Sequence, residues 1–310
     1  MDKNKKRLKL LVIGGTGFIG YHLCKRAVRL GWSVTSFSLN KPKKLRKLFK
    51  VKYCVGNITL KKSLKKIDKN FDFVVNLGGY VNHINKNENL KTHFVGCKNL
   101  VKIFSKRKIK CFLHIGSGAE YENIKSPHSE QSICNPKSIY GRPKFLATKY
   151  LLEQFKKKNF PCCIVRLYQV FGKKQDANRI IPFIIRSCFL NKNFPCSNGN
   201  QRRDFIEVGE VITLFIKILK KKKILGQIIN IGSGELIKIK SLIKKIRKII
   251  KKGNPQFGKI KLRKEEAKDF YPSIKKSIRL LTWKPKKNFN KNLISLINSE
   301  KKLIKKLNFR

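Results

Sequence analysis

The stretch that decides the fold is KLLVIGGTGFIGYHL, residues 9–23. It begins with a short apolar run and continues with Gly15, Gly17 and Gly20 in the spacing G-x-G-x-x-G. Glycine allows a tight turn and lets backbone N–H groups approach a pyrophosphate at the positive end of the following helix. A strand, this turn and a helix in that order indicate a dinucleotide-binding unit.

Apolar runs and helical periodicities alternate through the first half of the chain. Predicted strands cover residues 9–13, 33–37, 51–55, 71–77, 110–115 and 162–167, and predicted helices cover 18–30, 42–49, 60–68, 87–106 and 138–158. This alternation predicts an α/β fold with a doubly wound parallel sheet of the Rossmann type. The elements become shorter past residue 168, which predicts a smaller C-terminal α+β substrate domain.

This change of pattern predicts two domains. Residues 1–167 form the predicted dinucleotide-binding domain, with 208–235 returning to it, and 168–310 form most of the substrate-binding domain. The basic, amphipathic stretch at 292–307 is predicted to be a terminal helix in solvent, and binding to a membrane surface is the alternative.

The charge balance of the chain is unusual. Its 310 residues include 74 Lys and Arg against 17 Asp and Glu, a formal net charge of +57. Lysine clusters occur in every part of the chain, so we interpret the excess as a compositional trend that covers all surfaces. A polyanion partner is the alternative. Nucleic-acid binding would require a concentrated basic stripe with aromatic platforms, which the sequence does not show, although the charge leaves this partner open.

The apolar runs of the chain are short. None approaches the roughly 20 residues of a membrane-spanning helix, so no membrane span is expected. The run LKLLVI near the start is shorter than the ~7–15 apolar residues of a secretory signal, and we interpret it as a strand of a cytoplasmic protein. The nine cysteines contain no C-x-x-C pair, which predicts reduced thiols in the core and no metal site.

The segment SIYGRPK, residues 138–144, is predicted to begin a helix. Tyr140 and Lys144 are four residues apart, so they share one helix face. A nearby ammonium stabilises a phenolate, and such a pair can exchange a proton with a substrate hydroxyl or carbonyl. Pro143 falls in the first turn, where its missing N–H has no helical partner. Ser117 follows a predicted strand, at the sheet edge where ligands bind.

Eight short motifs follow one another along the chain. They are GGTGFIG (14–20), NLGG (76–79), HIGSGAEY (114–121), SIYGRPK (138–144), RLYQVFG (166–172), RRDFIEV (202–208), NIGSGE (230–235) and WKP (283–285). With these motifs the chain resembles the extended short-chain dehydrogenase/reductases, in particular the NAD-dependent epimerase/dehydratase group that acts on nucleotide sugars. The resemblance covers roughly residues 8–290 and implies an enzyme with the Rossmann fold.

The resemblance implies a role for each matching residue. Tyr140 corresponds to the family's proton-transferring tyrosine, Lys144 to the lysine that tunes it and holds the nicotinamide ribose, and Ser117 to the hydroxyl on the substrate oxygen. Around a bound dinucleotide the resemblance places Gly14, Gly15, Thr16, Gly17, Phe18, Ile19, Gly20, Ser38, Asn57, Ile58, Leu77, Gly78, Gly79, Tyr140 and Lys144.

Several positions depart from the family pattern. Asn57 stands where many members have an Asp near the adenine, and Gly209 and Glu210 replace a common Asp-Asp pair. Arg203 matches an arginine that binds the diphosphate of the substrate, whereas Gln169 replaces an Asn that usually contacts it. The resemblance also implies a homodimer, which family members form through the helices that carry and precede the Tyr–Lys pair.

The end of the second predicted strand favours one cofactor over the other. An acidic residue normally holds the adenosine ribose there, but this chain has Ser38, Asn40, Lys41 and Lys43. Such residues suit a 2′-phosphate, so NADP is favoured and NAD is the alternative.

The family carries out several reactions at one site. A 4,6-dehydratase needs an acidic residue just after Ser117, where this chain has Gly118 and Ala119, and Glu120 stands one place too late. A 4-ketoreductase, in which NADPH delivers hydride to a keto sugar while Tyr140 gives the proton, is favoured. A nucleotide-sugar 4-epimerase that retains NAD is the first alternative, and a non-catalytic nucleic-acid-binding member of the same fold is the alternative from another class.

Overall fold

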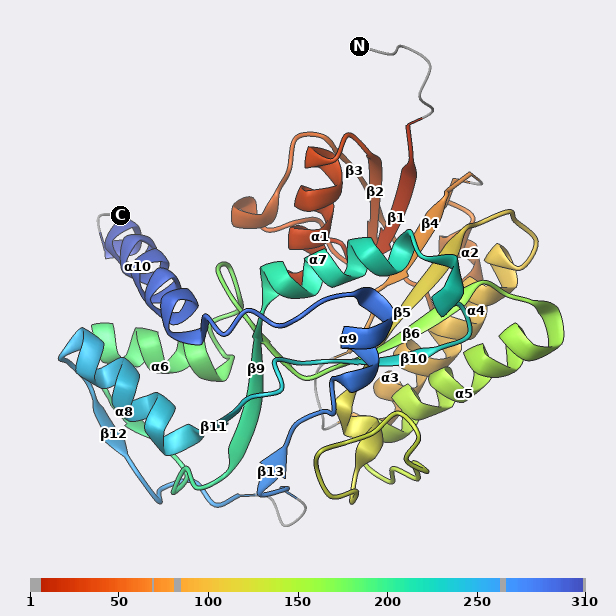
Figure 1. Cartoon of the computed structure of the whole chain (residues 1–310). Coiled ribbons are helices and arrows are strands. Elements are labelled where there is room, and N and C mark those ends of the chain that lie inside the picture. Colours follow the sequence, from red (N-terminus) through yellow and green to blue (C-terminus); the bar gives the residue numbers. More distant parts are fainter. Residues whose placement is uncertain (1–6, 69, 81–84, 263–265, 309–310) are drawn as a thin grey trace.

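The computed structural model describes residues 7–68, 70–80, 85–262 and 266–308. Seven parallel strands form its central sheet in the order β10-β6-β5-β4-β1-β2-β3 (Figure 1). Their bounds are Lys9–Ile13 (β1), Ser33–Ser38 (β2), Val51–Val55 (β3), Phe73–Asn76 (β4), Cys111–Ser117 (β5), Cys162–Leu167 (β6) and Ile228–Ile231 (β10). This order is that of a doubly wound dinucleotide-binding sheet with a seventh strand added, so the predicted Rossmann fold is confirmed.

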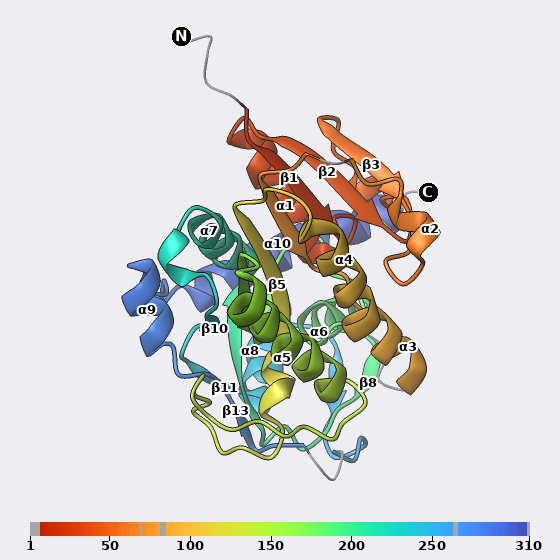
Figure 2. The same ribbon diagram turned by 90° about the vertical axis from the view of Figure 1, so that its right-hand side faces the viewer.

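Helices cover both faces of this sheet because its central strands are apolar on both sides. Every residue of β4 and of β6 is buried. One face packs against α1 (Phe18–Arg29) and α7 (Val208–Leu219), and the other against α4 (Gly96–Phe104) and α5 (Gly141–Lys158), as Figure 2 shows. The pairing of β10 with β6 supports the proposal that residues 208–235 return to the nucleotide-binding domain.

A second apolar core lies beyond the central sheet, at the lower left of Figure 1. It is formed mainly by α6 (Ile180–Phe189), α8 (Ile239–Ile250) and α10 (Phe289–Asn308). Six short strands accompany these helices: Gln169–Phe171 (β7), Asn193–Pro195 (β8), Arg202–Glu207 (β9), Leu236–Lys238 (β11), Asn254–Gln256 (β12) and Asp269–Phe270 (β13). This smaller unit, in which β9 pairs with β7, β11 and β13, has the α+β composition that the sequence predicted.

One predicted helix is absent from the described structure. The stretch at 42–49 forms only a 3₁₀ turn over Lys44–Arg46. The prediction is wrong because Arg46 turns inward, where its guanidinium donates to the carbonyl oxygen of Lys174 (2.6 Å) and pairs with Asp176 (2.9 Å). These partners lie far along the chain, so the local pattern does not reveal them.

The predicted helix at 87–106 changes its winding midway. Its first part is α3 (Lys86–Leu90), its last part is α4, and a π-helical turn over Lys91–Val95 joins them. Turns of this type occur frequently at functional sites. The turn carries His93, which is 2% exposed and points into the molecule. The helix predicted at 60–68 is also shorter than expected, since α2 covers only Lys61–Leu64.

The terminal helix α10 is not the solvated helix that the sequence predicted. Its apolar residues Leu293, Leu296 and Ile297 are buried in the second core, against α6. Glu300 is also fully buried, and Arg186 of α6 donates to its carboxylate over 2.7 Å. The prediction is wrong because the apolar stripe of α10 completes a core that the sequence alone did not place.

The cysteines contribute to the two cores. All nine are free thiols, and eight of them are buried. Burial raises the pKa of Cys24 and of Cys97 to about 12, so that these thiols stay protonated and pack as small apolar side chains.

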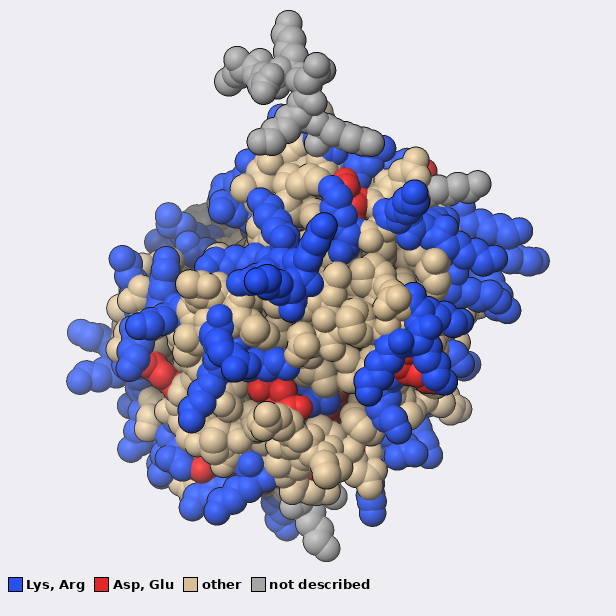
Figure 3. All heavy atoms as spheres, turned by 45° about the vertical axis from the view of Figure 1, so that its right-hand side comes forward, with Lys and Arg blue, Asp and Glu red and all other residues tan. Residues whose placement is uncertain are grey.

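The surface carries the charge. Lysine and arginine side chains cover much of the face in Figure 3, among few acidic ones. No helix within the described ranges is both long enough and apolar enough to cross a bilayer.

Replacement of Arg186 by Met should lower the free energy of unfolding by about 3–5 kcal/mol, because the buried carboxylate of Glu300 would lose its charge partner. Arg186→Met combined with Glu300→Leu removes both charges, so most of this stability should return. Urea unfolding of the wild type, the two single variants and the double variant measures the effect. An Arg186→Met variant as stable as the wild type would show that the pair does not hold α10 on α6.

Candidate active site

The turn between β1 and α1 can be built only with glycine. Gly14 has a φ of +77°, its N–H donates to the carbonyl oxygen of Phe37 (2.8 Å), and its own carbonyl accepts from the N–H of Gly17 (3.0 Å). A Cβ at Gly20 would lie 2.3 Å from the Gly14 oxygen. The first turn of α1 therefore sits directly on the backbone of the glycine turn, which a side chain at Gly20 would prevent.

The start of α1 is suited to an anion. Its first turn contains no acidic residue, and Gly17 at its N-cap offers no side chain to the helix N–H groups. Ser38, at the end of β2, is buried, and its Oγ accepts from the N–H of Thr16 (3.3 Å), which fixes the turn beside the helix. The residues present thus fit the pyrophosphate of NAD(P), which would lie against Gly15, Thr16, Gly17, Phe18 and Ile19.

The loop after β4 lies beside the glycine turn. The N–H of Leu77 donates to the carbonyl oxygen of Ile13 (3.0 Å), which joins this loop to the end of β1. A Cβ at Gly78 would lie 3.0 Å from the Ile58 side chain, and one at Gly79 would lie 2.7 Å from the ring of His93. Gly78 therefore lets the loop pack closely on Ile58, and Gly79 lets it pack closely on His93.

The side chain of Asn57 forms hydrogen bonds within its own loop. Its carboxamide oxygen accepts from both the N–H and the Oγ1 hydroxyl of Thr59, each over 2.9 Å. Only its NH₂ group is left for an adenine, which fits the weakened contact expected from an Asn at this position.

Ser117 is the last residue of β5 and is fixed by two local hydrogen bonds. Its Oγ accepts from the N–H of Ala119 (3.1 Å), and its own N–H donates to the carboxylate of Glu120 (3.0 Å). The strand starts one residue later and ends two residues later than the predicted 110–115, so Ser117 lies at the carboxyl end of the sheet.

Tyr140 and Lys144 are brought to the same strand end by α5. Tyr140 is the N-cap residue of this helix, and Gly141 packs so closely on the turn after β5 that a Cβ would lie 2.5 Å from the Ala119 oxygen. Lys144 Nζ donates to the carbonyl oxygen of Ile115 (2.7 Å) and lies 5.9 Å from the centre of the Tyr140 ring.

The burial of Lys144 sets it apart from the general lysine excess. Among the lysines whose exposure the structure describes, it is the only buried one, at 5%. A compositional trend places lysines in solvent, because burial of an ammonium without a specific role is costly. The general excess of lysine therefore does not explain why Lys144 is buried.

His93 is a neighbour of Tyr140 that the sequence did not indicate. Its ring stands edge-on to the Tyr140 ring, with 5.2 Å between the ring centres, and its Nε2 lies 3.0 Å from the carbonyl oxygen of Tyr80. His93 thus joins the tyrosine to the loop after β4. The contact depends on the π-helical turn, which no feature of the sequence pattern predicts.

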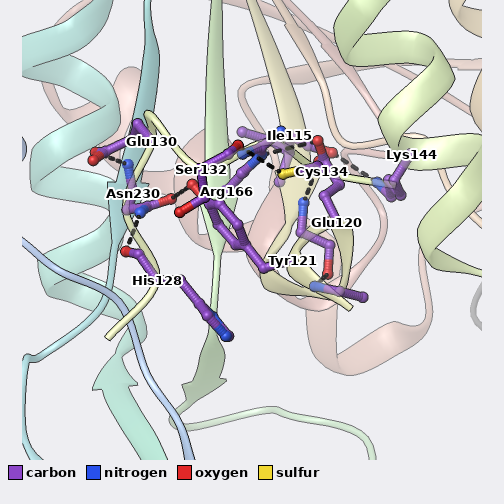
Figure 4. Close-up of polar contacts among 12 residues, drawn as sticks. Ile115, Glu120, Tyr121, His128, Glu130, Ser132, Cys134, Lys144, Arg166 and Asn230 are labelled. Carbon is purple, nitrogen blue, oxygen red and sulfur yellow. Dashed lines mark hydrogen bonds and ion pairs between the residues drawn. The ribbon is translucent and has the colours of Figure 1, made fainter. Parts of the chain in front are cut away.

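The carboxylates of the two glutamates that follow Ser117 form hydrogen bonds within the protein. Glu120 is fully buried, and Arg166 Nε donates to its carboxylate over 2.9 Å (Figure 4). Glu122 accepts from the backbone N–H groups of Lys137 (2.8 Å) and Ser138 (2.7 Å), just before Tyr140. Glu120 therefore pairs with a buried cation, and Glu122 fixes the backbone just before Tyr140.

Arg203 and Gln169 lie on neighbouring strands of the smaller sheet. Gln169 is exposed at the start of β7 and is opposite Phe205 of β9. Arg203, also on β9, is buried, donates to the carbonyl oxygen of Lys268 (3.3 Å) and pairs with Glu266. Their predicted roles in diphosphate binding stay predictions.

A family model described as the NAD dependent epimerase/dehydratase family matches residues 10–232. The chain therefore belongs to this family. Within the described ranges, no group of three or more His, Cys, Asp or Glu side chains is arranged to hold a metal ion.

Individual relatives differ in what their names state. The chain is 28% identical over 273 residues to the dTDP-D-glucose 4,6-dehydratase of Dictyostelium discoideum, which covers 77% of this chain and 61% of that protein. It is 27% identical over 302 residues to the putative UDP-glucose 4-epimerase of Methanocaldococcus jannaschii, with 93% of this chain and 97% of that protein covered.

A solved structure shares the fold over nearly the whole chain. It is the UDP-glucuronic acid 4-epimerase from Bacillus cereus in complex with UDP-glucuronic acid and NAD. Its TM-score is 0.86 at 24% identity, and the match covers 96% of this chain and 100% of that one.

Gly20→Ala should abolish measurable binding of NAD(H) and NADP(H), because the new methyl group would collide with the backbone of Gly14 and displace α1 from the turn. Gly31→Ala is the matched control. It introduces the same methyl group just past the end of α1, at a glycine with a φ of +78° and no atom within 4 Å of the added Cβ. It should lower the free energy of unfolding by about 1 kcal/mol without weakening the binding of the cofactor. Fluorescence titration with NADH and NADPH measures the cofactor affinity of both variants. Normal binding by Gly20→Ala would contradict the proposed position of the cofactor pyrophosphate at the glycine turn.

Proposed function

We propose that this enzyme uses NADPH to reduce the 4-keto group of a nucleotide-activated sugar. The observation that carries the proposal is the position of Lys144, whose buried Nζ donates to Ile115 at the end of β5 and lies 5.9 Å from the Tyr140 ring. Ser117 ends the same strand. A phenol, an ammonium and a hydroxyl therefore belong to one edge of a parallel sheet, where such folds bind their ligands.

The three residues have distinct chemical tasks in this proposal. NAD(P) supplies hydride transfer at its nicotinamide ring when it is bound. Ser117 donates a hydrogen bond to the substrate carbonyl oxygen, which gains negative charge during reduction. Tyr140 gives that oxygen its proton, and Lys144 stabilises the phenolate that results. Because Lys144 is buried, its charge acts on the phenol through a medium of lower dielectric than water.

Elimination of water is less well supported, although one relative is named a 4,6-dehydratase. Glu120, the acid nearest to the position that such a reaction requires, is fully buried against Arg166. The residue directly after Ser117 is Gly118, and a Cβ there would lie 2.8 Å from the ring of Phe270. A side chain at this position would therefore require the Phe270 ring to shift.

A preference for NADP rests on the end of β2. Between Ser38 and Lys43 the chain has no acidic residue, and Asn40 and Lys41 are exposed there. Lys43 Nζ lies 3.8 Å from Asp176 in an exposed pair, which is weak enough to be displaced. These cations would attract the 2′-phosphate of NADP. The Bacillus cereus structure is described with NAD, so we propose that the two proteins differ at this point.

The substrate would extend from the Tyr–Lys pair toward the smaller sheet. We propose that its diphosphate binds Arg203 and contacts Gln169, which lie on adjacent strands. The diphosphate would then compete with the carboxylate of Glu266, which now pairs with Arg203. We also propose a homodimer that pairs through α4 and α5, as the family resemblance implies.

A nucleotide-sugar 4-epimerase is the second candidate. It is favoured by the match to the putative UDP-glucose 4-epimerase, which covers 97% of that protein. The same serine, tyrosine and lysine would serve, but an epimerase regenerates its cofactor in each cycle and keeps it bound. Mass spectrometry of the nucleotide that copurifies separates the candidates: retained NAD favours the epimerase, and an empty site that accepts only NADPH favours the reductase.

The cofactor preference predicts that Lys41→Glu weakens NADPH binding about tenfold, since a charge that attracts the 2′-phosphate becomes one that repels it. Binding of NADH, which lacks this phosphate, should stay within about twofold. Lys106→Glu makes the same change in net charge at an exposed site after α4 and should alter neither affinity. Equal weakening of NADPH and NADH by Lys41→Glu would contradict the proposed 2′-phosphate contact.

The proton-transfer role predicts that Tyr140→Phe lowers kcat by about 10²- to 10⁴-fold, because the ring stays in place but the proton donor is lost. The affinity for NADPH should not change. Tyr150→Phe removes a hydroxyl from the same helix and should leave kcat intact, since Tyr150 packs against Phe94. Steady-state rates with nucleotide 4-keto sugars provide the measurement, and undiminished turnover by Tyr140→Phe would overturn the proposed function.

A further inference from the structure

A buried ion pair between Glu120 and Arg166 contacts the backbone of Ser117. Glu120 is 0% exposed and Arg166 is 2% exposed. One oxygen of the Glu120 carboxylate accepts from Arg166 Nε (2.9 Å), and the other accepts from the backbone N–H of Ser117 (3.0 Å). The carboxylate therefore links the side chain of Arg166, on β6, to the backbone of the serine that ends β5.

The surroundings of the pair leave little room for another arrangement. A Cβ at Gly116 would lie 2.3 Å from the Glu120 carboxylate, so the carboxylate fills the space that a side chain on β5 would take. The guanidinium of Arg166 lies over the ring of Tyr121, 4.4 Å from its centre. In Figure 4 these side chains lie together inside the protein, between the strand ends and α5. Such a pair holds its geometry because each charge is buried with its partner.

The same turn decides how the Ser117 hydroxyl can act. Its Oγ already accepts a hydrogen bond from the N–H of Ala119 (3.1 Å). One lone pair is thereby used, and the hydroxyl hydrogen remains to be donated. Glu120 is needed for this arrangement because it closes the other half of the capping box on the backbone N–H of Ser117.

The pair also belongs to a wider buried network. The hydroxyl of Tyr121 donates to Asn230 Oδ1 (2.9 Å), and Asn230 Nδ2 donates to the carbonyl oxygen of His128 (3.0 Å). His128 Nδ1 lies 2.7 Å from the hydroxyl of Tyr168. Strand β10 and the segment before α5 are thus tied to the turn that holds Ser117, so the turn is supported on more than one side.

We propose that Glu120 and Arg166 are positioning residues that hold the Ser117 hydroxyl as a hydrogen-bond donor toward the substrate oxygen. The inference rests on the proposed function, since it assigns the pair a part in the same reaction. Neither residue needs to touch the substrate. A donor held in place before the reaction stabilises the transition state more than one that must be ordered, so loss of the pair should act on kcat.

The test is a comparison of Glu120→Gln in two backgrounds. In the wild type, Glu120→Gln should lower kcat about 10- to 100-fold and leave the KM of the sugar and the affinity for NADPH within about threefold. In the Ser117→Ala background it should change kcat by less than about twofold, because the hydroxyl that it positions is gone. A purely structural role would lower kcat by the same factor in both backgrounds.

Two further variants separate a loss of catalysis from a loss of folding. Glu120→Gln leaves Arg166 without a buried counter-charge and should lower Tm by about 10 °C, so the cycle is repeated with Glu120→Gln/Arg166→Met, which carries no buried charge there. The double variant should fold and show the same background-dependent loss of kcat. Glu153→Gln removes an exposed carboxylate that pairs with Lys157 on α5 and should leave kcat unchanged.

The outcomes separate the inference from the proposed function. Turnover by the wild type together with equal losses in both backgrounds would overturn the positioning role and leave the reductase proposal intact. Full activity of the folded double variant would also overturn it. Failure of the wild type to turn over any nucleotide sugar would overturn the proposed function itself and, with it, the role of the pair in that reaction.

Discussion

The hydrogen bond from Lys144 Nζ to the carbonyl oxygen of Ile115 is the contact on which the site depends. It joins α5 to the end of β5, so the helix that begins at Tyr140 cannot move independently of the strand that ends at Ser117. The parallel sheet brings the ends of β1 and β4 to the same edge through the pairing of neighbouring strands. One buried ammonium thus connects the candidate proton donor to the part of the fold suited to a dinucleotide.

The excess of lysine makes the few buried charges informative. With 17 acidic residues against 74 basic ones, most cations have no nearby acid to pair with. Yet Glu120, Asp204 and Glu300 are all fully buried, where each holds an arginine or backbone N–H groups. Burial raises the pKa of Asp204 to about 6, which shows how costly such a site is for a carboxylate. Each of these three buried acids is thus held by specific partners within the fold.

The sequence predicted those features that depend on local order along the chain. The apolar runs and the glycine spacing were sufficient for the Rossmann sheet, and the four-residue spacing placed Tyr140 and Lys144 on one helix. Features that depend on distant partners were not predictable in this way. Arg46 is drawn inward by Asp176, 130 residues away, which removed the helix expected at 42–49. His93 meets Tyr140 only because a π-helical turn rotates it inward, and the apolar face of α10 is buried because it packs into the core that α6 and α8 form.

The position of a carboxylate along the turn after Ser117 changes what it can do. An acid at the position of Gly118 would have to share its space with Phe270, whereas Glu120 reaches back past Gly116 to the interior. There its carboxylate accepts hydrogen bonds from Arg166 and from the backbone N–H of Ser117. The sequence predicted that Glu120 stands one place too late for elimination. In the structure the Glu120 carboxylate lies where it can order the backbone of Ser117.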